Sequence, residues 1–410
     1  MRVRWLGLAA LAAAAVGCSG CGGVGSADVS EAMGSELAIY SSLPLQGPSA
    51  QASEQIVDGE KLALADAGGR AGDFKVGYVS LDDANPSSGQ WSPGVTATNA
   101  KTAADDTSTI AYIGDYDSGA TAVSLPLINA AGVLQISPAS PYVGLTSSLD
   151  AGQDEPERFY PTGKQTFVRL QAGDPVQAAA QTRLMKQLGV RSVYVLDDQE
   201  PFEVPLADIV AQDAGRAGIK VIAHDSLATT PGSVFTGEVE RIVESHAQAV
   251  FLSGLAGAGT AKLWRELHNA DPQLLLLGSS ALEGDSFTAH LGTAAERTYL
   301  TTPMLPVREY PAPAQSVLRD YRRTFGSEGG AEALYGYEAM TLVLDAIRAA
   351  GSHGNDRRTV LDGVLATRDR HSVIGEYSIA PDGESTISRY GVDRVSDGRA
   401  VFDRTIEVQR

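Results

Sequence analysis

The chain has 410 residues, of which 43% are hydrophobic, and it carries a formal net charge of −18 at pH 7. This length and hydrophobic content predict a globular protein of about two domains. The acidic balance excludes nucleic acid as an expected partner, because phosphate binding needs clustered Lys and Arg side chains. It also excludes adhesion to anionic lipid by charge, so membrane attachment would require a covalent lipid.

The first residues have the pattern of an export signal. Two arginines precede the uncharged run Leu6–Val16, and small residues lead to Cys18. This run is too short to cross a hydrocarbon core of ~30 Å as a helix. Small residues before a cysteine resemble the lipobox of bacterial lipoproteins, with Cys18 as the lipidated first residue of the mature chain and Cys21 as the fallback acceptor. An ordinary secretory peptide cleaved near Ala15 is the alternative.

Cysteine usage supports an exported body without disulfides. Cys18 and Cys21 are the only cysteines in the sequence, and a domain of this size can be stabilised by burial alone. We expect residues 1–17 to be the signal peptide and residues 18–36, rich in Gly, Ser and Ala, to be the lipid anchor and a flexible tether. The predicted location is the outer face of the cell membrane.

From Leu37 onward, short apolar runs alternate with amphipathic stretches. The predicted strands are Leu37–Ser41, Phe74–Ser80, Thr109–Ile113, Val133–Ile136, Ser192–Leu196, Lys220–Ala223, Ala249–Leu252, Leu274–Leu277 and Tyr299–Thr302. The predicted helices are Glu54–Ala67, Pro93–Asp106, Ala120–Ala131, Val176–Leu188, Val204–Ala217, Val234–His246, Thr260–Ala270, Ala312–Phe325, Ala331–Ala350 and Asp356–Ala366. This alternation predicts an α/β fold built from right-handed βαβ units, with mostly parallel, doubly wound sheets.

The number of strands and one charged segment indicate two lobes. Eight or nine strands exceed one doubly wound unit, and the proline-bearing stretch 150–164 interrupts the alternation, so we expect a lobe boundary just after it. The tail changes to period two, which predicts antiparallel strands at Glu376–Ile379, Ser388–Val395 and Ala400–Ile406 with turns between them.

Signals for catalysis are weak. The six histidines form no HExxH pattern, and no GxSxG nucleophile elbow occurs. The glycine-rich turn Gly254–Thr260 follows a strand and opens a helix, but it lacks the lysine of a phosphate loop. We therefore expect no enzyme activity, no metal and no cofactor, and we interpret this turn as a tight strand-to-helix connection.

Two other loops follow strands and carry small polar groups. In doubly wound sheets ligands bind at this edge, so Ser118 and the amides after it are placed to hold a carboxylate, although Ser118 is equally suited to cap the helix. The loop Ser137–Tyr142 is a second polar turn beside it. Trp91, Tyr116 and Tyr142 lie in such loops and are candidates for the pocket wall, or for ordinary packing.

Several short motifs, taken in order, carry a family resemblance. They are Leu43–Pro48, Asp58–Gly59, Asp82–Asp83, Ile113–Gly114 with Ser118, Ile136–Ala139 with Leu145–Thr146, Tyr335–Ala339 and Gly375–Tyr377. Together they resemble the leucine/isoleucine/valine-binding family of type I periplasmic binding proteins, in its lipoprotein form. The similarity covers nearly the whole chain from Leu37.

The resemblance implies two Rossmann-like lobes joined by a hinge of three crossovers, with a small ligand between them. The first lobe is expected to comprise residues 37–168 plus 301–375, and the second residues 169–300 plus 376–410. Members of the family deliver their ligand to an ABC importer, so the implied partners are a small-molecule ligand, ABC permease subunits and the membrane through the lipid anchor.

The resemblance also implies the ligand contacts. The expected ligand-binding residues are Ser118, Gly119, Ala139, Ser140, Pro141, Phe202, Leu255 and Ser280. Ser118 would bind the ligand carboxylate, with help from the backbone around Ala139 and Pro141. Phe202 stands where many members have a tyrosine, and Leu255 matches a second pocket aromatic. Ser280 matches the glutamate that pairs with the ligand's ammonium group.

The sequence departs from the family pattern at two of these positions. Ser280 is not acidic, and a buried ammonium without a partner would cost several kcal/mol. Glu283 is the nearest substitute. Pro141 lacks an N–H donor. We therefore hypothesise that an amine-free acid binds at least as well as leucine; the competing expectation is a branched-chain amino acid whose ammonium is bound by Glu283 or a backbone carbonyl.

The sequence thus predicts a lipid-anchored, extracytoplasmic solute-binding protein of an ABC importer that captures a branched-chain amino acid or a related small amphipathic acid. Closure of the two lobes on the ligand would exclude water. A ligand-sensing receptor component with the same fold is one alternative. An exported α/β hydrolase is another, disfavoured by the missing nucleophile motif.

Overall fold

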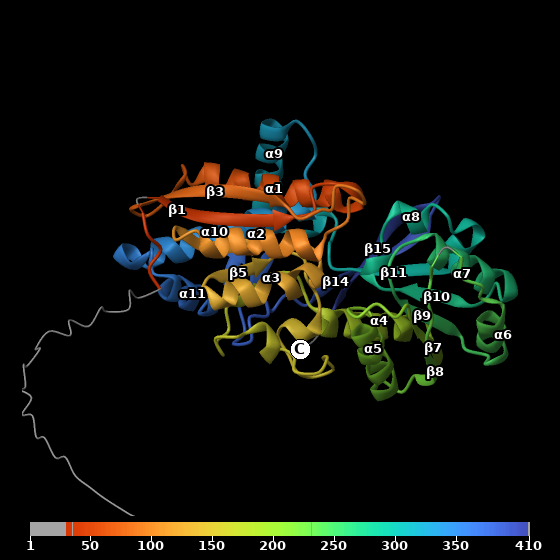
Figure 1. Ribbon diagram of the computed structural model, residues 1–410. Coiled ribbons are helices and arrows are strands. Elements are labelled where there is room, and N and C mark those ends of the chain that lie inside the picture. Colours follow the sequence, from red (N-terminus) through yellow and green to blue (C-terminus); the bar gives the residue numbers. More distant parts are fainter. Residues whose placement is uncertain (1–29, 35, 231, 409–410) are drawn as a thin grey trace, which may run out of the picture.

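The computed structural model describes residues 30–34, 36–230 and 232–408, which form two α/β lobes side by side (Figure 1). The predicted signal peptide and Cys18 lie outside these residues. The tether predicted for residues 18–36 extends too far, because Ala32 is only 2% exposed, its amide donates to the carbonyl of Asn355 at 2.7 Å, and the first strand already begins at Glu36. Within the described part of the chain, no helix is both long and apolar enough to span a membrane.

The first lobe is built on a six-stranded sheet of order β2-β3-β1-β4-β5-β6, in which all pairs except β2 with β3 are parallel. Its strands are β1 (Glu36–Leu43), β2 (Arg70–Ala71), β3 (Phe74–Asp82), β4 (Thr109–Gly114), β5 (Leu134–Ser137) and β6 (Phe167–Arg169). Its helices are α1 (Ala50–Asp66), α2 (Pro93–Asp105), α3 (Ser118–Ala130), α9 (Ala312–Phe325), α10 (Ala331–Ala349) and α11 (Arg357–Leu365).

Both faces of this sheet are buried, as apolar strands of a parallel sheet require. Neighbouring side chains along a strand point to opposite faces, so Ile39 packs with α1, α10 and α11 whereas Tyr40 packs with α2 and α3. Ala111 and Tyr112 of β4 divide in the same way. Continuous apolar runs therefore specify a sheet covered by helices on both sides.

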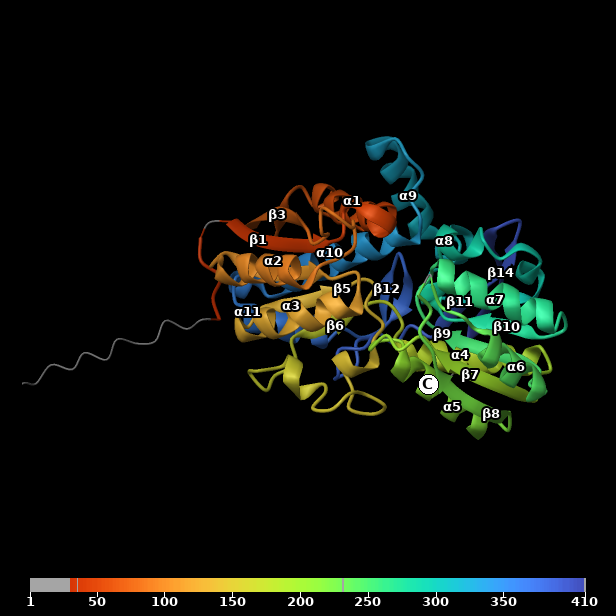
Figure 2. The same ribbon diagram turned by 45° about the vertical axis from the view of Figure 1, so that its right-hand side comes forward.

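Helix α10 comes from the far end of the sequence but lies against α1 (Figure 2). A β-carbon on Gly336 would overlap the carbonyl of Ile56, and one on Gly59 would overlap the carbonyl of Ala333. The two glycines thus allow the helix backbones to approach closely. This explains two of the motifs, Asp58–Gly59 and Tyr335–Gly336, as packing features of the first lobe.

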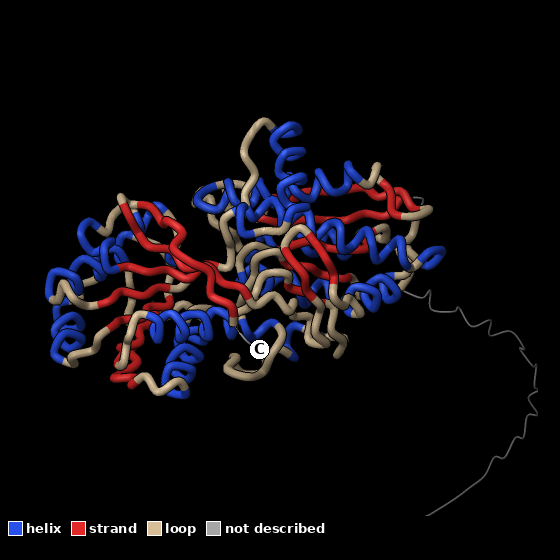
Figure 3. The backbone as a smooth tube through the Cα atoms, turned by 180° about the vertical axis from the view of Figure 1, so that it is seen from behind, coloured by secondary structure: helices blue, strands red, loops and turns tan. Residues whose placement is uncertain are grey.

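The second lobe contains a seven-stranded sheet of order β15-β14-β11-β10-β9-β7-β8, and the two separate sheets are visible from behind in Figure 3. Its strands are β7 (Ser192–Asp197), β8 (Lys220–Ser226), β9 (Ala249–Ser253), β10 (Leu275–Gly278), β11 (Thr298–Thr302), β14 (Arg389–Ser396) and β15 (Arg399–Glu407). Its helices are α4 (Asp174–Gln187), α5 (Val204–Arg216), α6 (Thr236–Glu244), α7 (Ala258–Ala270) and α8 (Asp285–Thr288).

This sheet is also covered on both sides. Val195 and Phe251 pack with α4 and α5, whereas Leu196 and Leu252 pack with α6 and α7, where Trp264 is fully buried. The predicted tail hairpin is present, since β14 pairs antiparallel with β11 and β15.

Three crossings join the lobes, and the first and third run together. Arg169 N donates to the carbonyl of Gly383 at 3.0 Å, and Ser385 N donates to the carbonyl of Arg169 at 3.1 Å. The hydroxyl of Ser385 also donates to the carbonyl of Leu170 at 2.7 Å. The second crossing leaves β11, which is paired with β14. The hinge is therefore a hydrogen-bonded bundle of chain segments.

The expected lobe boundaries differ from the sheet edges by a few residues. Arg169 still belongs to β6, and Thr301 and Thr302 still belong to β11, because the pairing of each strand continues past the predicted boundary. Residues 376 and 377 remain with the first lobe because the hydroxyl of Tyr377 donates to Glu338 on α10 at 2.6 Å.

Two local predictions need correction. The strand predicted at Glu376–Ile379 is β13 (Gly375–Tyr377), and it pairs with β12 (Arg370–Ser372) in a separate two-stranded sheet rather than with the tail hairpin. The short strand β6 had no counterpart among the predicted strands. Its three residues provide no window in which a period can be recognised.

Candidate functional site

Ser118 begins helix α3, and three residues separate it from the end of strand β4 at Gly114. The residue before it, Asp117, has extended backbone and stands at the cap position, so the alternative that Ser118 is the helix cap is wrong. The Ser118 hydroxyl oxygen instead accepts a hydrogen bond from the backbone N–H of Tyr142 at 3.2 Å. Its hydroxyl hydrogen remains available to a ligand, as do the first-turn amides of α3, which have no partner within the helix.

The loop Ser137–Tyr142 is held by hydrogen bonds within the first lobe and by one from the start of α4. The Ser137 hydroxyl oxygen accepts hydrogen bonds from the amides of Ala139 at 3.2 Å and Ser140 at 2.9 Å. The carbonyl of Pro141 accepts from the amide of Asp174 at 2.9 Å. The backbone donors expected around Ala139 and Pro141 are therefore engaged, and the donors on this side are the Ser118 hydroxyl and the start of α3.

Asp115 connects the loop before α3 to the loop Ser137–Tyr142 by hydrogen bonds. Its backbone carbonyl accepts from the hydroxyls of Ser137 at 2.8 Å and Ser140 at 3.1 Å. Its fully buried carboxylate accepts from the hydroxyls of Tyr112 at 2.9 Å and Ser124. Burial raises the pKa of Asp115 to about 7 against the effect of these hydrogen bonds. Ser140 thus faces Asp115 and supports the loop.

One contact between the lobes is formed by four residues, Trp91, Gly119, Tyr142 and Phe202, which we call the interlobe cluster. The rings of Tyr142 and Phe202 meet edge to face, with centroids 5.0 Å apart and an interplanar angle of 83°. A β-carbon on Gly119 would overlap the ring of Trp91 and lie 2.9 Å from Cε2 of Phe202. Only a residue without a side chain fits at position 119 between these rings. The cluster brings together four of the predicted site residues.

Glu203 was missed by the sequence analysis. It follows Phe202 and precedes α5, and its Oε2 atom accepts from the hydroxyls of Ser253 at 2.7 Å and Ser279 at 3.2 Å. Burial raises the pKa of Glu203 to about 7. The available signal was an acidic residue after a strand end beside a predicted site residue. Nothing in the sequence indicated that two serines from other strands would donate hydrogen bonds to this carboxylate.

The other predicted residues of the second lobe lie around this group but face different partners. Leu255 is 48% exposed, and its amide donates to Asp198 at 2.6 Å. The hydroxyl of Ser280 donates to the buried Gln177 at 3.2 Å. Glu283 lies beside Thr302, and burial, followed by the charge of Asp393, raises its pKa well above the usual range.

Two of the candidate wall aromatics also have structural contacts. Tyr116 packs against the cluster of Leu43, Ile56 and Val57, and burial raises its pKa. The hydroxyl of Tyr142 donates to Glu155 at 2.5 Å, and its ring is 3% exposed. Tyr142 therefore supports the interlobe cluster from within the core.

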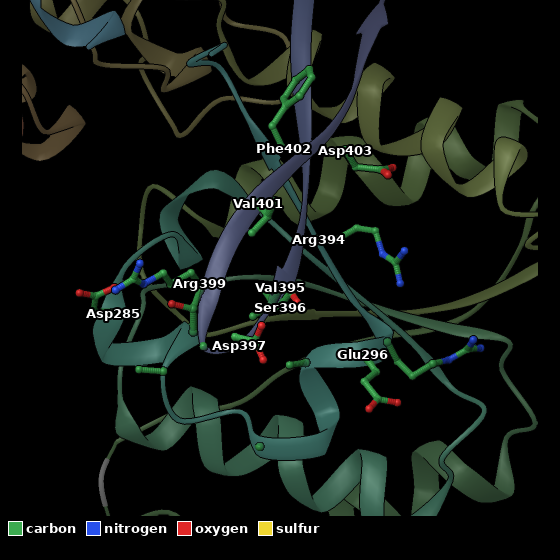
Figure 4. A pocket seen from close by; sticks show the side chains of 16 residues that line it. Asp285, Glu296, Arg394, Val395, Ser396, Asp397, Arg399, Val401, Phe402 and Asp403 are labelled. Atoms are coloured by element: carbon green, nitrogen blue, oxygen red, sulfur yellow. The ribbon is translucent and has the colours of Figure 1, made fainter. Parts of the chain in front are cut away.

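A cavity of about 1190 Å³ lies elsewhere in the second lobe, between the β14–β15 hairpin and the segment around α8 (Figure 4). Its lining includes the charged residues Asp285, Glu296, Arg394, Arg399 and Asp403. None of the predicted ligand-binding residues borders it. In the described residues, no group of three or more His, Cys, Asp or Glu side chains is arranged to hold a metal ion.

Comparison with known proteins gives matches along most of the chain. A Leu/Ile/Val-binding protein homolog from Brucella melitensis is 25% identical over 363 residues, which cover 87% of this chain and 91% of that relative. A leucine-binding protein from Thermotoga maritima has a similar fold, with a TM-score of 0.73 and 21% identity over 90% of this chain and 99% of that one. A solute-binding protein of an ABC transporter from R. palustris, in complex with benzoate, has a TM-score of 0.68 and 17% identity over 90% and 95% of the two chains.

The family model for periplasmic binding proteins matches residues 41–399. The match covers both sheets and all three crossings between the lobes. The chain therefore belongs to the periplasmic binding protein family.

Proposed function

We propose that this protein is the solute-binding component of an ABC importer and captures a branched-chain amino acid or a related small amphipathic carboxylate between its lobes. The observation that carries the proposal is the interlobe cluster, in which Gly119, beside the donor group Ser118, meets Phe202 of the second lobe. The names of similar proteins, which specify leucine, Leu/Ile/Val and benzoate as ligands, agree with this solute class.

The proposed capture of the solute involves two steps, binding of the solute and closure of the two lobes. A solute carboxylate is bound by the Ser118 hydroxyl and the amides at the start of α3, where the helix dipole favours an anion. The aromatic rings of Trp91 and Phe202 would cover the apolar part of the solute. Closure of the second lobe then excludes water, and it is favoured by the tighter binding of the solute to the closed form.

Attachment to the membrane is part of the same proposal. We infer that Cys18 carries the lipid and that the segment before residue 30 is the tether, so the binding lobes are held at the outer face of the membrane. A lipoprotein anchor with several acyl chains would hold the protein firmly, whereas a single chain would not. The permease subunits of the importer are the proposed partner.

Thermal-shift screening tests the solute class. The purified mature protein is mixed with leucine, isoleucine, valine, short-chain carboxylates and benzoate, with neutral sugars as the control set. A ligand at a hundred times its dissociation constant adds about 2.7 kcal/mol of stability, which raises the melting temperature by a measurable amount. Stabilisation by a sugar and by no carboxylate would contradict the proposal.

A further inference from the structure

We propose that Glu203 is the specificity-determining residue for the ligand's ammonium group. This assignment rests on the proposed function and deepens it, because it selects solutes that carry an ammonium beside a carboxylate. It takes over the role expected of an acidic residue at position 280, where this chain has a serine. It also replaces the hypothesis that an amine-free acid binds as well as leucine.

The carboxylate of Glu203 is oriented by two serines. Ser253 is the last residue of β9, and Ser279 directly follows β10, so both hydroxyls come from the carboxyl edge of the second sheet. Both donate to Oε2. Among the described residues no hydrogen bond to Oε1 is found, and the Glu203 side chain is only partly buried. One oxygen of Glu203 thus has two serine donors, and the other has none among the described residues.

The position of Glu203 in the chain brings it to the interface between the lobes. Its neighbour Phe202 contacts Gly119, and Gly119 follows Ser118. Ser118 in the first lobe and Glu203 in the second are therefore the chain neighbours of the two residues that meet across the lobes. An α-amino acid carries a carboxylate and an ammonium that match these two groups.

The two other candidate partners for an ammonium in the second lobe are Ser280 and Glu283. Ser280 donates to Gln177, whose Oε1 also accepts from the hydroxyl of Tyr390 at 3.0 Å. Glu283 is the competing acid, because its Oε1 is buried without a hydrogen-bond partner in the described part of the chain, although the nearby charge of Asp393 disfavours its ionised form. A half-buried carboxylate such as Glu203 gains from a positive partner, because an opposite charge offsets the cost of its own burial.

Isothermal titration calorimetry on Glu203→Gln tests the assignment. The variant keeps the size and an acceptor oxygen but removes the charge. Ligands are measured in pairs, leucine with 4-methyl-2-oxopentanoate and valine with 3-methyl-2-oxobutanoate. Glu200→Gln is the matched control, because Glu200 is an exposed acid in the same loop, and Glu283→Gln tests the competing acid. Melting curves confirm that each variant is folded.

We expect Glu203→Gln to weaken amino-acid binding by about 10- to 100-fold, the effect of losing one charge-assisted hydrogen bond. Binding of the oxo acids should change by less than about threefold on the same scale, and Glu200→Gln should bind like wild type. Unchanged amino-acid affinity in Glu203→Gln, or a selective loss in Glu283→Gln instead, would overturn the assignment and leave solute capture intact. If the wild-type protein binds the oxo acids more tightly than the amino acids, the assignment of Glu203 is likewise overturned and solute capture is unaffected. Failure of the wild type to bind any small carboxylate, with or without an amine, would contradict the proposed function itself and with it the assignment.

Discussion

Arg169 and Glu384 form an ion pair across the hinge, although they are 215 residues apart in the sequence. Arg169 is fully buried at the end of β6, and its Nε donates to Oε2 of Glu384 at 3.1 Å. Its Nη1 donates to the carbonyls of Ser140 at 2.6 Å and Tyr142 at 2.9 Å. One guanidinium thus links the first and third crossings to the loop beside Ser118.

We expect Glu384→Gln to lower the free energy of unfolding by about 3 kcal/mol, because it leaves the buried Arg169 without its counter-charge. Urea denaturation measures this. The control is Glu328→Gln, which breaks an exposed pair with Arg322 and should cost less than about 1 kcal/mol. Equal effects of the two substitutions would show that the buried pair has no special contribution.

Ser118→Ala should weaken solute binding by about 1–3 kcal/mol, the typical effect of losing a hydrogen bond to a charged group. The substitution also removes the acceptor for the amide of Tyr142, so a small decrease in melting temperature is expected. Ser88→Ala is the control, because the hydroxyl oxygen of this exposed loop serine also accepts a backbone hydrogen bond, at 3.3 Å. Calorimetric titration that finds wild-type affinity in Ser118→Ala would remove this residue from the site.

Gly119→Ala should weaken solute binding by about tenfold or more, because the new methyl group would collide with Trp91 and Phe202 and keep the lobes from meeting. The matched control is Gly94→Ala at the start of α2, where a β-carbon meets open space. That change should leave affinity unaltered and stabilise the helix slightly. Small-angle scattering with and without ligand measures closure; a Gly119→Ala variant that closes like wild type would contradict this expectation.

His224 should make stability depend on pH. A hydrogen bond to Asp197, with Nε2 and Oδ2 3.1 Å apart, raises the pKa of His224 above its usual value near 6.5. The folded state therefore holds this proton more tightly than the unfolded chain. The resulting stability is fully present below about pH 6.5 and is lost as the pH rises through the raised pKa.

Urea denaturation of His224→Gln between pH 5.5 and 8.5 is the corresponding measurement. The variant should be less stable than wild type by about 1 kcal/mol at the acidic end, and the difference should shrink toward the alkaline end. His371→Gln is the control, since that side chain is 82% exposed beside Glu376. A difference that grows with pH would show that the protonated form of His224 does not stabilise the folded state.

Processing at Cys18 predicts a diacylated mature N-terminus at that residue. Mass spectrometry of the protein from membranes checks it. Cys18→Ser should release the protein from the membrane fraction, while Cys21→Ser should leave it attached. A mature chain that begins near Ala15 without lipid would establish ordinary secretion instead.

The sequence alone determined the local elements and their class. Apolar runs such as Thr109–Ile113 and helical periods such as Ala331–Ala350 predicted β4 and α10 to within a residue, because a buried strand or helix is specified by side chains that are close in the chain. Ser118 was placed at the end of a strand by the same local reasoning.

Contacts between distant segments were decided by the tertiary structure. Ser253 and Ser279 converge on Glu203 only when β9 and β10 pair, and Arg169 meets Glu384 only where two crossings run together. A local periodicity in the sequence cannot predict these contacts, because they depend on how whole helices and strands pack against one another. The family pattern placed the acid for an ammonium at position 280, whereas packing presents one at position 203, because a charge can reach the same edge of a sheet from any strand that ends there.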